Sequence, residues 1–534
     1  MKIIFSRFVF LFVALIFGGL AFGFDNPSSA ADAVSISGSV IDANGPIQGA
    51  SVRIRATDNQ VYSDTSGEFT LEGLNPGEQV EVTAWADGYY VTSLQVVPPA
   101  SGISLTLRPY HGTDNPDYQW ISPVAGSSDK ACGNCHPMIM PQWEVNAHGQ
   151  AISNPRFFSM YNGTDISGLN QVAPGYLSDF PDTAGNCANC HAPGSAVDGY
   201  LTTNMNNVRG EITAGIHCDF CHKVGGVFLN GNTGTVFPNS PGVRSQKVLR
   251  PPSNDNIFFG PFDDIPDPDT YLPIISESQF CAPCHQFSFW GTPIYESYNE
   301  WLNSSYANEG ITCQNCHMPP NGDSFFALPE VGGLPHPPES IPSHLQVGAE
   351  NTELLQNSVE LFVDLVQVGG KIIVSVEVTN TDVGHHIPTD HPGRHLILIV
   401  EVLDGQDKPL PQLSGPKIPD WGGSQAGEPG KAFAKVLRDT ESGNFPVVSY
   451  WNQTSILSDN RVAAGETDSS TYTFAAPSAG ETIRLLVELR FRRLFYDTLS
   501  TKGWDNPDVI MEQASKSIII NPWWQIYLPL TNAR

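Results

Sequence analysis

Basic residues are scarce in this sequence of 534 residues. It contains 27 lysines and arginines against 55 aspartates and glutamates, so its formal net charge at pH 7 is −28. A surface of this charge argues against nucleic acid and anionic lipid as partners, because both would be repelled. It favours basic protein partners, cations or oxidised metal species, although an acidic surface often serves only solubility.

Cysteine is absent outside one motif. All ten cysteines lie in five copies of Cys-x-x-Cys-His, whereas a shuffled chain of this composition would contain only about 0.005 copies. The five copies are Cys132, Cys135 and His136; Cys187, Cys190 and His191; Cys218, Cys221 and His222; Cys281, Cys284 and His285; and Cys313, Cys316 and His317.

The spacing of this motif suits covalent attachment of haem. Two thiols at positions i and i+3 lie along one side of a helical turn and can both reach one edge of a porphyrin, while a histidine at i+4 points along the same face to the iron. A structural zinc site uses four ligands in a closed set and has no need of a histidine after every second cysteine. A disulfide framework is the other alternative that the cysteine count allows. The sequence therefore predicts five haem c groups, each with its iron bound by the motif histidine.

Haem of this type is attached outside the cytoplasmic membrane, so the chain should begin with an export signal. Lys2 and Arg7 precede the apolar run FVFLFVALIFGGLAFGF and a stretch of small residues that ends at Ala31. This pattern predicts a cleaved signal peptide over residues 1–31. An uncleaved anchor is the alternative, since the run is near the length that spans a bilayer. We expect a secreted protein, periplasmic or extracellular, that is not integral to the membrane after cleavage.

Residues 35–110 have the pattern of a small β domain. Alternating runs such as SVRIRA (51–56), GEFTLEGL (67–74) and QVEVTAW (79–85) are separated by turn signals such as Asn75-Pro76-Gly77. The segment resembles the carboxypeptidase regulatory-like, transthyretin-like β-sandwich in the positions of Pro46-Ile47, Thr65-x-Gly67-x-Phe69 and Gly88-Tyr89. The resemblance implies a spacer or docking module without a catalytic residue.

Residues 111–345 contain the five motifs and show little regular periodicity, which is expected where cofactors fill the core. We expect a loop-rich haem domain with short α-helices around the motifs and one further helix over residues 297–306. The intervals between successive first cysteines are 55, 31, 63 and 32 residues. Two short intervals suggest two close pairs of haems.

Residues 346–520 return to strand patterns. The segments KIIVSVEVTN (371–380) and TIRLLVELRF (482–491) alternate apolar and polar residues, so one face of each strand is apolar. Together with RHLILIVEVLDGQ and STYTFAAP they predict an immunoglobulin-like β-sandwich. Residues 521–534 form an apolar, aromatic tail that is too short to span a membrane. We expect a packed terminal strand there, with a subunit contact or a sorting tail as alternatives.

An iron that only carries electrons needs a second axial ligand, whereas an iron that performs chemistry keeps an open position. His148 follows the first motif closely and has Trp143 as an apolar neighbour, while His217 directly precedes Cys218, which turns it toward a neighbouring haem. Methionine ligation by Met138, Met140 or Met318 is a less favoured alternative. We expect the second ligands among His148, His217, His336, His344 and His385, with His111, His386, His391 and His395 as weaker candidates.

Several segments resemble the secreted multihaem c-type cytochromes of bacteria. They include CHPMIMPQWEVNAH, GIHCDFCHKV, FCAPCHQF, CQNCHMP and VGHHIPTDHPGRHLILIVEVLDG, and the resemblance covers about residues 128–500. It implies bis-histidine ligation of the haem irons, with His148 and His385 matching the family's motifs.

Five haems predict an electron carrier that has no catalytic residue and serves redox protein partners or an extracellular acceptor, for instance in extracellular respiration. Self-association stays open. The alternative is a reductase of a nitrogen or sulfur oxyanion, with Arg394 and the histidines from His385 to His395 as its anion-binding wall. Cytochrome c nitrite reductases, which this chain resembles only in outline, usually have lysine at the catalytic haem, whereas all five motifs here end in histidine. A non-redox haem store is the least favoured reading.

Overall fold

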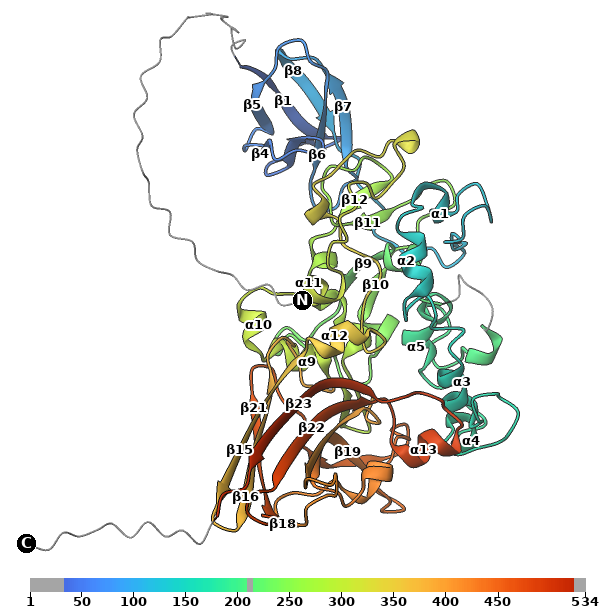
Figure 1. Ribbon diagram of the computed structural model, residues 1–534. Helices are drawn as coiled ribbons and strands as arrows, with labels where there is room; N and C mark the ends of the chain where they lie inside the picture. Colours follow the sequence, from blue (N-terminus) through green and yellow to red (C-terminus); the bar gives the residue numbers. More distant parts are fainter. Residues whose placement is uncertain (1–32, 209–214, 523–534) are drawn as a thin grey trace, which may run out of the picture.

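The structure of the protein is a computed structural model that describes residues 33–208 and 215–522 (Figure 1). The expected signal peptide and residues 523–534 of the expected tail lie outside the described residues. Three parts follow one another along the molecule: a group of N-terminal strands, a central region of short helices, and two larger sheets at the opposite end (Figure 1). None of the helices in the described ranges has the length and hydropathy of a membrane span.

The N-terminal part consists of two four-stranded sheets that share one apolar core. In one sheet β1 pairs with β2, β5 and β8, the last in parallel, and the other sheet has the order β4-β3-β6-β7. Alternate strand residues such as Ile36, Val52, Leu71 and Val82 are fully buried between the sheets. The strands are β1 (Val34–Asp42), β2 (Gly45–Pro46), β3 (Ser51–Ile54), β4 (Gln60–Tyr62), β5 (Glu68–Leu74), β6 (Val80–Trp85), β7 (Thr92–Val96) and β8 (Ala100–Thr106).

The central region is loop-rich with short helices, as predicted. These helices are α1 (Cys132–Cys135), α2 (Met140–Val145), α3 (Pro155–Asn162), α4 (Tyr176–Asp179), α5 (Ala188–His191), α6 (Pro193–Ala196), α7 (Cys218–Cys221), α8 (Ala282–His285) and α11 (Cys313–His317). Three two-stranded sheets were not predicted: β9 (Val224–Val227) with β10 (Gln246–Val248), β11 (Phe258–Gly260) with β12 (Asp269–Tyr271), and β13 (Phe287–Phe289) with β14 (Thr292–Tyr295).

The single helix predicted over residues 297–306 is two helices in the structure, α9 (Ser297–Leu302) and α10 (Ser305–Asn308). Between them the hydroxyl of Ser304 donates a hydrogen bond to the carbonyl of Trp301 (2.7 Å). Such a side-chain bond competes with the helical backbone bonds. The prediction of one continuous helix was therefore wrong.

The C-terminal part contains two antiparallel sheets, with the orders β15-β16-β21-β18 and β20-β19-β17-β22-β23. The two alternating segments of the sequence are β16 and β22, and their apolar faces are buried in one common core, as predicted. The elements are α12 (Thr352–Gln356), β15 (Val359–Val368), β16 (Lys371–Asn380), β17 (His395–Leu403), β18 (Gln412–Ser414), β19 (Gly430–Asp439), β20 (Thr454–Asp459), β21 (Thr467–Ala475), β22 (Thr482–Arg492), α13 (Tyr496–Thr501) and β23 (Val509–Ile519).

The N-terminal part packs directly on the central region. The side chain of Tyr90 is 1% exposed and belongs to an apolar cluster with Leu249, Ile257 and Phe259 of the central region. Indole Nε1 of Trp85 donates to Thr270 Oγ1 (3.1 Å). These contacts are buried, so the N-terminal strands are fixed against the region that carries the motifs.

Candidate functional site

Each of the five motifs forms a single helical turn in the structure. The turns are α1, α5, α7, α8 and α11, and in each the two cysteines lie three residues apart along the turn. Local side chains begin two of these turns: Thr312 and Asn315 form a capping box for α11, and Nδ1 of His217 accepts a hydrogen bond from the backbone of Phe220 in α7 (3.2 Å). None of the ten cysteines, all of them described, forms a disulfide.

Thiols of different motifs meet in the structure. Three pairs of thiols lie close enough to shift one another's pKa: Cys132 and Cys218, Cys190 and Cys284, and Cys281 and Cys313. The fourth motif therefore contacts the second and the fifth, and the first contacts the third. The sequence intervals suggested the fourth and fifth motifs as one close pair, which agrees with the proximity of Cys281 and Cys313. They suggested the second and third motifs as another pair, and Cys187 and Cys221 of these two motifs pack against the same apolar cluster.

Four of the five motif histidines use Nδ1 to contact a protein oxygen. For three of them the partner is a backbone carbonyl: that of Phe326 for His136 (2.7 Å), of Phe259 for His222 (2.7 Å) and of Val347 for His317 (2.5 Å). For His285 the partner is the carboxylate of Asp390, at 3.3 Å. A bond at Nδ1 fixes the orientation of the ring and leaves Nε2 for a metal.

The electrostatics of these histidines differ. Burial alone would lower the pKa of His285, but the hydrogen bond and charge of Asp390 raise it to about 9. Burial lowers the pKa of His191 to about 4, and it lowers that of His222 despite the bond to Phe259. Neutral imidazole, the form that binds iron, is thus favoured at the second and third motifs.

Three of the expected second ligands lie opposite a motif histidine. The ring centroids of His148 and His285 are 6.3 Å apart, those of His344 and His222 are 6.5 Å apart, and those of His385 and His317 are 6.3 Å apart. In a bis-histidine haem, two iron–nitrogen bonds of about 2 Å and the distance from each nitrogen to its ring centre separate the centroids by about 6 Å.

These residues fit haem c. The thiols lie three residues apart on helical turns, the ring spacing leaves room for one iron between each pair, and Nδ1 of both rings is bound to protein in two of the three pairs. In these pairs His148 contacts the side-chain oxygen of Gln346, and His385 contacts the carbonyl of His386. The arrangement defines a class of protein: one that holds several haems by thioether and histidine bonds.

The other two expected ligands, His217 and His336, have aromatic neighbours. His217 is buried against Trp120 (5.2 Å between centroids) and is adjacent to Cys218, whose thiol meets the first motif. His336 packs on Phe326 (5.2 Å), the residue whose carbonyl binds His136. Both therefore lie near the first motif.

His191 of the second motif faces an aromatic pocket. The cavity measures about 110 Å³ and is lined by Phe157, Tyr161, Tyr176, Tyr295, Tyr450 and Trp451, besides Cys187, Cys190 and Cys284. The rings of Phe157 and His191 are 4.2 Å apart, and the hydroxyls of Tyr295 and Tyr450 are 2.9 Å apart. His191 is the one histidine among the described residues that line this cavity.

The remaining histidines of the 385–395 segment have other surroundings. Nδ1 of His386 lies 3.6 Å from Glu300, and Nδ1 of His391 accepts from the backbone of Gly393 (3.1 Å). His395 is fully buried between Trp421 and Phe495. Burial lowers the pKa of His391 to about 3 and that of His395 to about 4. His111, the other weak candidate, is half exposed beside Asp255.

Sequence reasoning missed the residues that hold this segment. Glu300 of α9 is 4% exposed and binds Arg461 (2.7 Å), the hydroxyl of Thr389 (2.5 Å) and the backbone N–H of His386 (3.2 Å). Neither Asp390 nor Gln346 was predicted to contact a motif histidine or its partner. Asp390 could have been noticed, because it lies within the resembling segment VGHHIPTDHPGRH.

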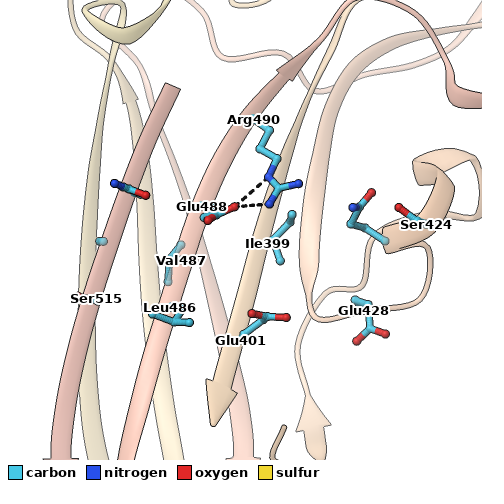
Figure 2. A pocket seen from close by; sticks show the side chains of 12 residues that line it. Ile399, Glu401, Ser424, Glu428, Leu486, Val487, Glu488, Arg490 and Ser515 are labelled. Atoms are coloured by element: carbon cyan, nitrogen blue, oxygen red, sulfur yellow. Dashed lines mark hydrogen bonds and ion pairs between the residues drawn. The ribbon is translucent and has the colours of Figure 1, made fainter. Parts of the chain in front are cut away.

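A larger cavity lies elsewhere, on the outer face of the five-stranded C-terminal sheet. It measures about 620 Å³, and Glu401, Glu428 and Glu488 surround it (Figure 2). Glu488 is paired with Arg490 of the same strand (Figure 2). No residue of the five motifs lines this cavity, so it does not belong to the haem sites.

Comparison with known proteins supports these observations. Residues 35–108 match the carboxypeptidase regulatory-like domain, and residues 131–223 match the family of cytochrome c554 and c-prime. No curated protein matches the sequence. A penta-heme cytochrome c552 from Thermochromatium tepidum has a similar structure, with a TM-score of 0.52 and 19% sequence identity; the match covers 72% of this chain and 97% of that chain. A β-glucuronidase from glycoside hydrolase family 2 aligns with a TM-score of 0.13 and 8% identity over 30% of this chain and 11% of its own, which carries no argument.

The five motifs, the two matched families and the shared fold identify the chain as a multihaem c-type cytochrome with a carboxypeptidase regulatory-like domain at its N-terminal end.

Proposed function

We propose that this cytochrome carries electrons through five covalently attached haems, one at each motif. Haem supplies a one-electron iron couple when bound. The cysteines of each motif would hold it by thioether bonds and the motif histidine would bind its iron, with His148, His344 and His385 as second ligands of the fourth, third and fifth haems. The observation that carries the proposal is the set of three opposed histidine pairs at 6.3–6.5 Å.

The contacts between motifs support transfer along the chain. Thiols of the first and third motifs meet, as do those of the second and fourth and of the fourth and fifth. Cys221 in the third motif lies near Cys284 in the fourth. All five motifs are thereby connected, and the edges of neighbouring porphyrins would lie close together, as electron transfer requires.

We also propose a secreted protein, periplasmic or extracellular, whose acidic surface meets a basic redox partner or an oxidised metal species, with respiration outside the cell as the setting. We further propose that the protein self-associates through its β domains. We also propose that both of these domains are β-sandwiches and that the C-terminal one is immunoglobulin-like. The net charge of −28 supports a basic partner. Transfer to such a partner should slow steeply as ionic strength rises.

The test of the main proposal combines mass and spectroscopy. The mass of the mature chain should correspond to five haems, and the ferric protein should give electron paramagnetic resonance signals from low-spin haems. Fewer than five haems, or no reversible reduction in a potentiometric titration, would refute it.

A reductase of a nitrogen or sulfur oxyanion is the second candidate, because one pocket favours an open iron. The cavity at His191 is lined by aromatic rings and the paired hydroxyls of Tyr295 and Tyr450 rather than by a second histidine. Arg394 lies near Tyr295, and its positive charge would attract an anion. A high-spin ferric signal that shifts when nitrite, hydroxylamine or cyanide is added would support this function. Spectra that do not change when any of the three ligands is added would exclude the reductase function.

A further inference from the structure

The fourth motif histidine is held by a different kind of group from the three others that have an Nδ1 partner. His136, His222 and His317 contact neutral backbone carbonyls. Nδ1 of His285 instead lies 3.3 Å from Oδ2 of Asp390. A carboxylate carries a full negative charge, so its effect on the imidazole differs in kind from that of a carbonyl dipole.

The carboxylate of Asp390 is fixed in this position by its surroundings. Its Oδ1 accepts a hydrogen bond from the backbone N–H of Ser297 (3.2 Å), at the start of α9. The side chain is 12% exposed, so solvent screens its charge only weakly. The backbone of Asp390 has a φ of 61°, in the left-handed region that residues other than glycine adopt at a cost. The bond to Ser297 and the burial of the side chain thus hold the carboxylate beside His285.

We propose that Asp390 gives the haem of the Cys281–His285 motif the lowest reduction potential in the chain; the inference rests on the proposed function. A carboxylate that accepts a hydrogen bond from Nδ1 makes the imidazole a stronger electron donor to its metal. Stronger donation, together with a nearby buried negative charge, favours ferric over ferrous iron and lowers the potential. The carbonyls at the other motifs have a smaller effect of the same sign.

The place of this motif gives the low potential a function. Its two cysteines lie next to cysteines of the second and fifth motifs, and Cys284 also lies near Cys221 of the third. The fourth haem would therefore stand at the junction of the array. The haem of lowest potential is the least populated with electrons, so the electrons would reside on the neighbouring haems of higher potential. They would pass through the fourth haem only when an acceptor oxidises a haem beyond it.

The test is a potentiometric titration of the full-length holoprotein and of Asp390→Asn, followed optically and by electron paramagnetic resonance. In the wild type one haem should be reduced last. In Asp390→Asn that last step should move to higher potential, while the other four stay in place. The control is Asp407→Asn, because Asp407 has the same φ of 61° but is exposed and pairs only with Arg484 among the described ion pairs; it should leave all five steps unchanged.

Two outcomes would overturn the inference: a last step that does not move in Asp390→Asn, or five steps that all move together. If Asp390→Asn fails to load five haems, Arg394→Gln decides instead. Arg394 lies near Asp390, so removing its positive charge should lower the potential of the last reduction step further. An unchanged potential of that step in Arg394→Gln would refute the proposal. Failure of the proposed function would appear separately, as fewer than five haems or no reversible reduction in the wild type.

Discussion

At the scale of single residues, the partner of Nδ1 determines which nitrogen of each histidine can bind iron. The side-chain oxygen of Gln346 contacts Nδ1 of His148 and also accepts from Nδ2 of Asn146 (3.0 Å). An amide oxygen can only accept, so Nδ1 of His148 carries the proton and Nε2 is the free ligand atom. Burial, together with the charge of His285, lowers the pKa of His148 to about 4. His148 is therefore neutral, as a ligand must be.

A methionine in place of His148 should change one haem only. We expect His148→Met to keep five haems and to raise the potential of the fourth by roughly 0.2 V, within the range of about 0.8 V that axial ligands span. The measurement is a redox titration with electron paramagnetic resonance. His111→Met is the matched control, because His111 is half exposed. Equal changes in both variants would show that His148 is not a ligand.

At the scale of elements, the sequence was most informative where one periodicity or motif decides the local structure. The strands β16 and β22 follow from simple alternation, because one face of each is buried in a common core. The five helical turns follow from the motif spacing. The break between α9 and α10 did not, because it depends on how one hydroxyl bonds locally.

Contacts between distant elements could not be predicted either. Nothing in the spacing of the motifs indicates that the first meets the third, or that Asp390 and Gln346 reach histidines more than a hundred residues away. His148, His344 and His385 were proposed from local sequence, but their opposite partners depend on the tertiary fold. His217 and His336 lie near the first motif, and their roles as ligands stay predictions.

The segment that follows β16 depends on one buried carboxylate of α9. Glu300→Gln would leave the charge of Arg461, which is 3% exposed, with only Asp459 as a partner among the described ion pairs. We expect a loss of about 3 kcal/mol in stability, as for other broken buried pairs. The haem at His317 should also change its low-spin signal, since the same segment carries His385.

The measurement for Glu300→Gln is thermal unfolding together with electron paramagnetic resonance of the ferric protein. Glu488→Gln is the matched control, because its pair with Arg490 lies on the sheet surface and is about one third exposed. A surface pair of this kind contributes at most about 1 kcal/mol. If both variants lose the same stability and neither spectrum changes, Glu300 does not hold the segment.

At the scale of the whole molecule, contacts of the N-terminal domain lead to a motif histidine. Tyr90 and Phe259 belong to one buried apolar cluster, and the carbonyl of Phe259 binds Nδ1 of His222 in the third motif. The hydroxyl of Tyr90 also donates to the carbonyl of Asn256 (2.7 Å), just before β11. Through β11 the position of the N-terminal domain is thus linked to the orientation of one imidazole.

Truncating Tyr90 should therefore loosen the domain and disturb one haem at the same time. Tyr90→Ala removes a buried ring, which costs on the order of 3–5 kcal/mol, and frees β11 to shift. We expect faster proteolysis between residues 107 and 114, a larger radius of gyration in solution scattering, and a changed low-spin signal from the third haem alone.

Tyr62→Ala is the control on the same domain, because Tyr62 is 67% exposed, and it should change none of these. A Tyr90→Ala protein that becomes extended while all five haem signals stay the same would show that the domain docks without influencing the haems, and the link through Phe259 would be wrong.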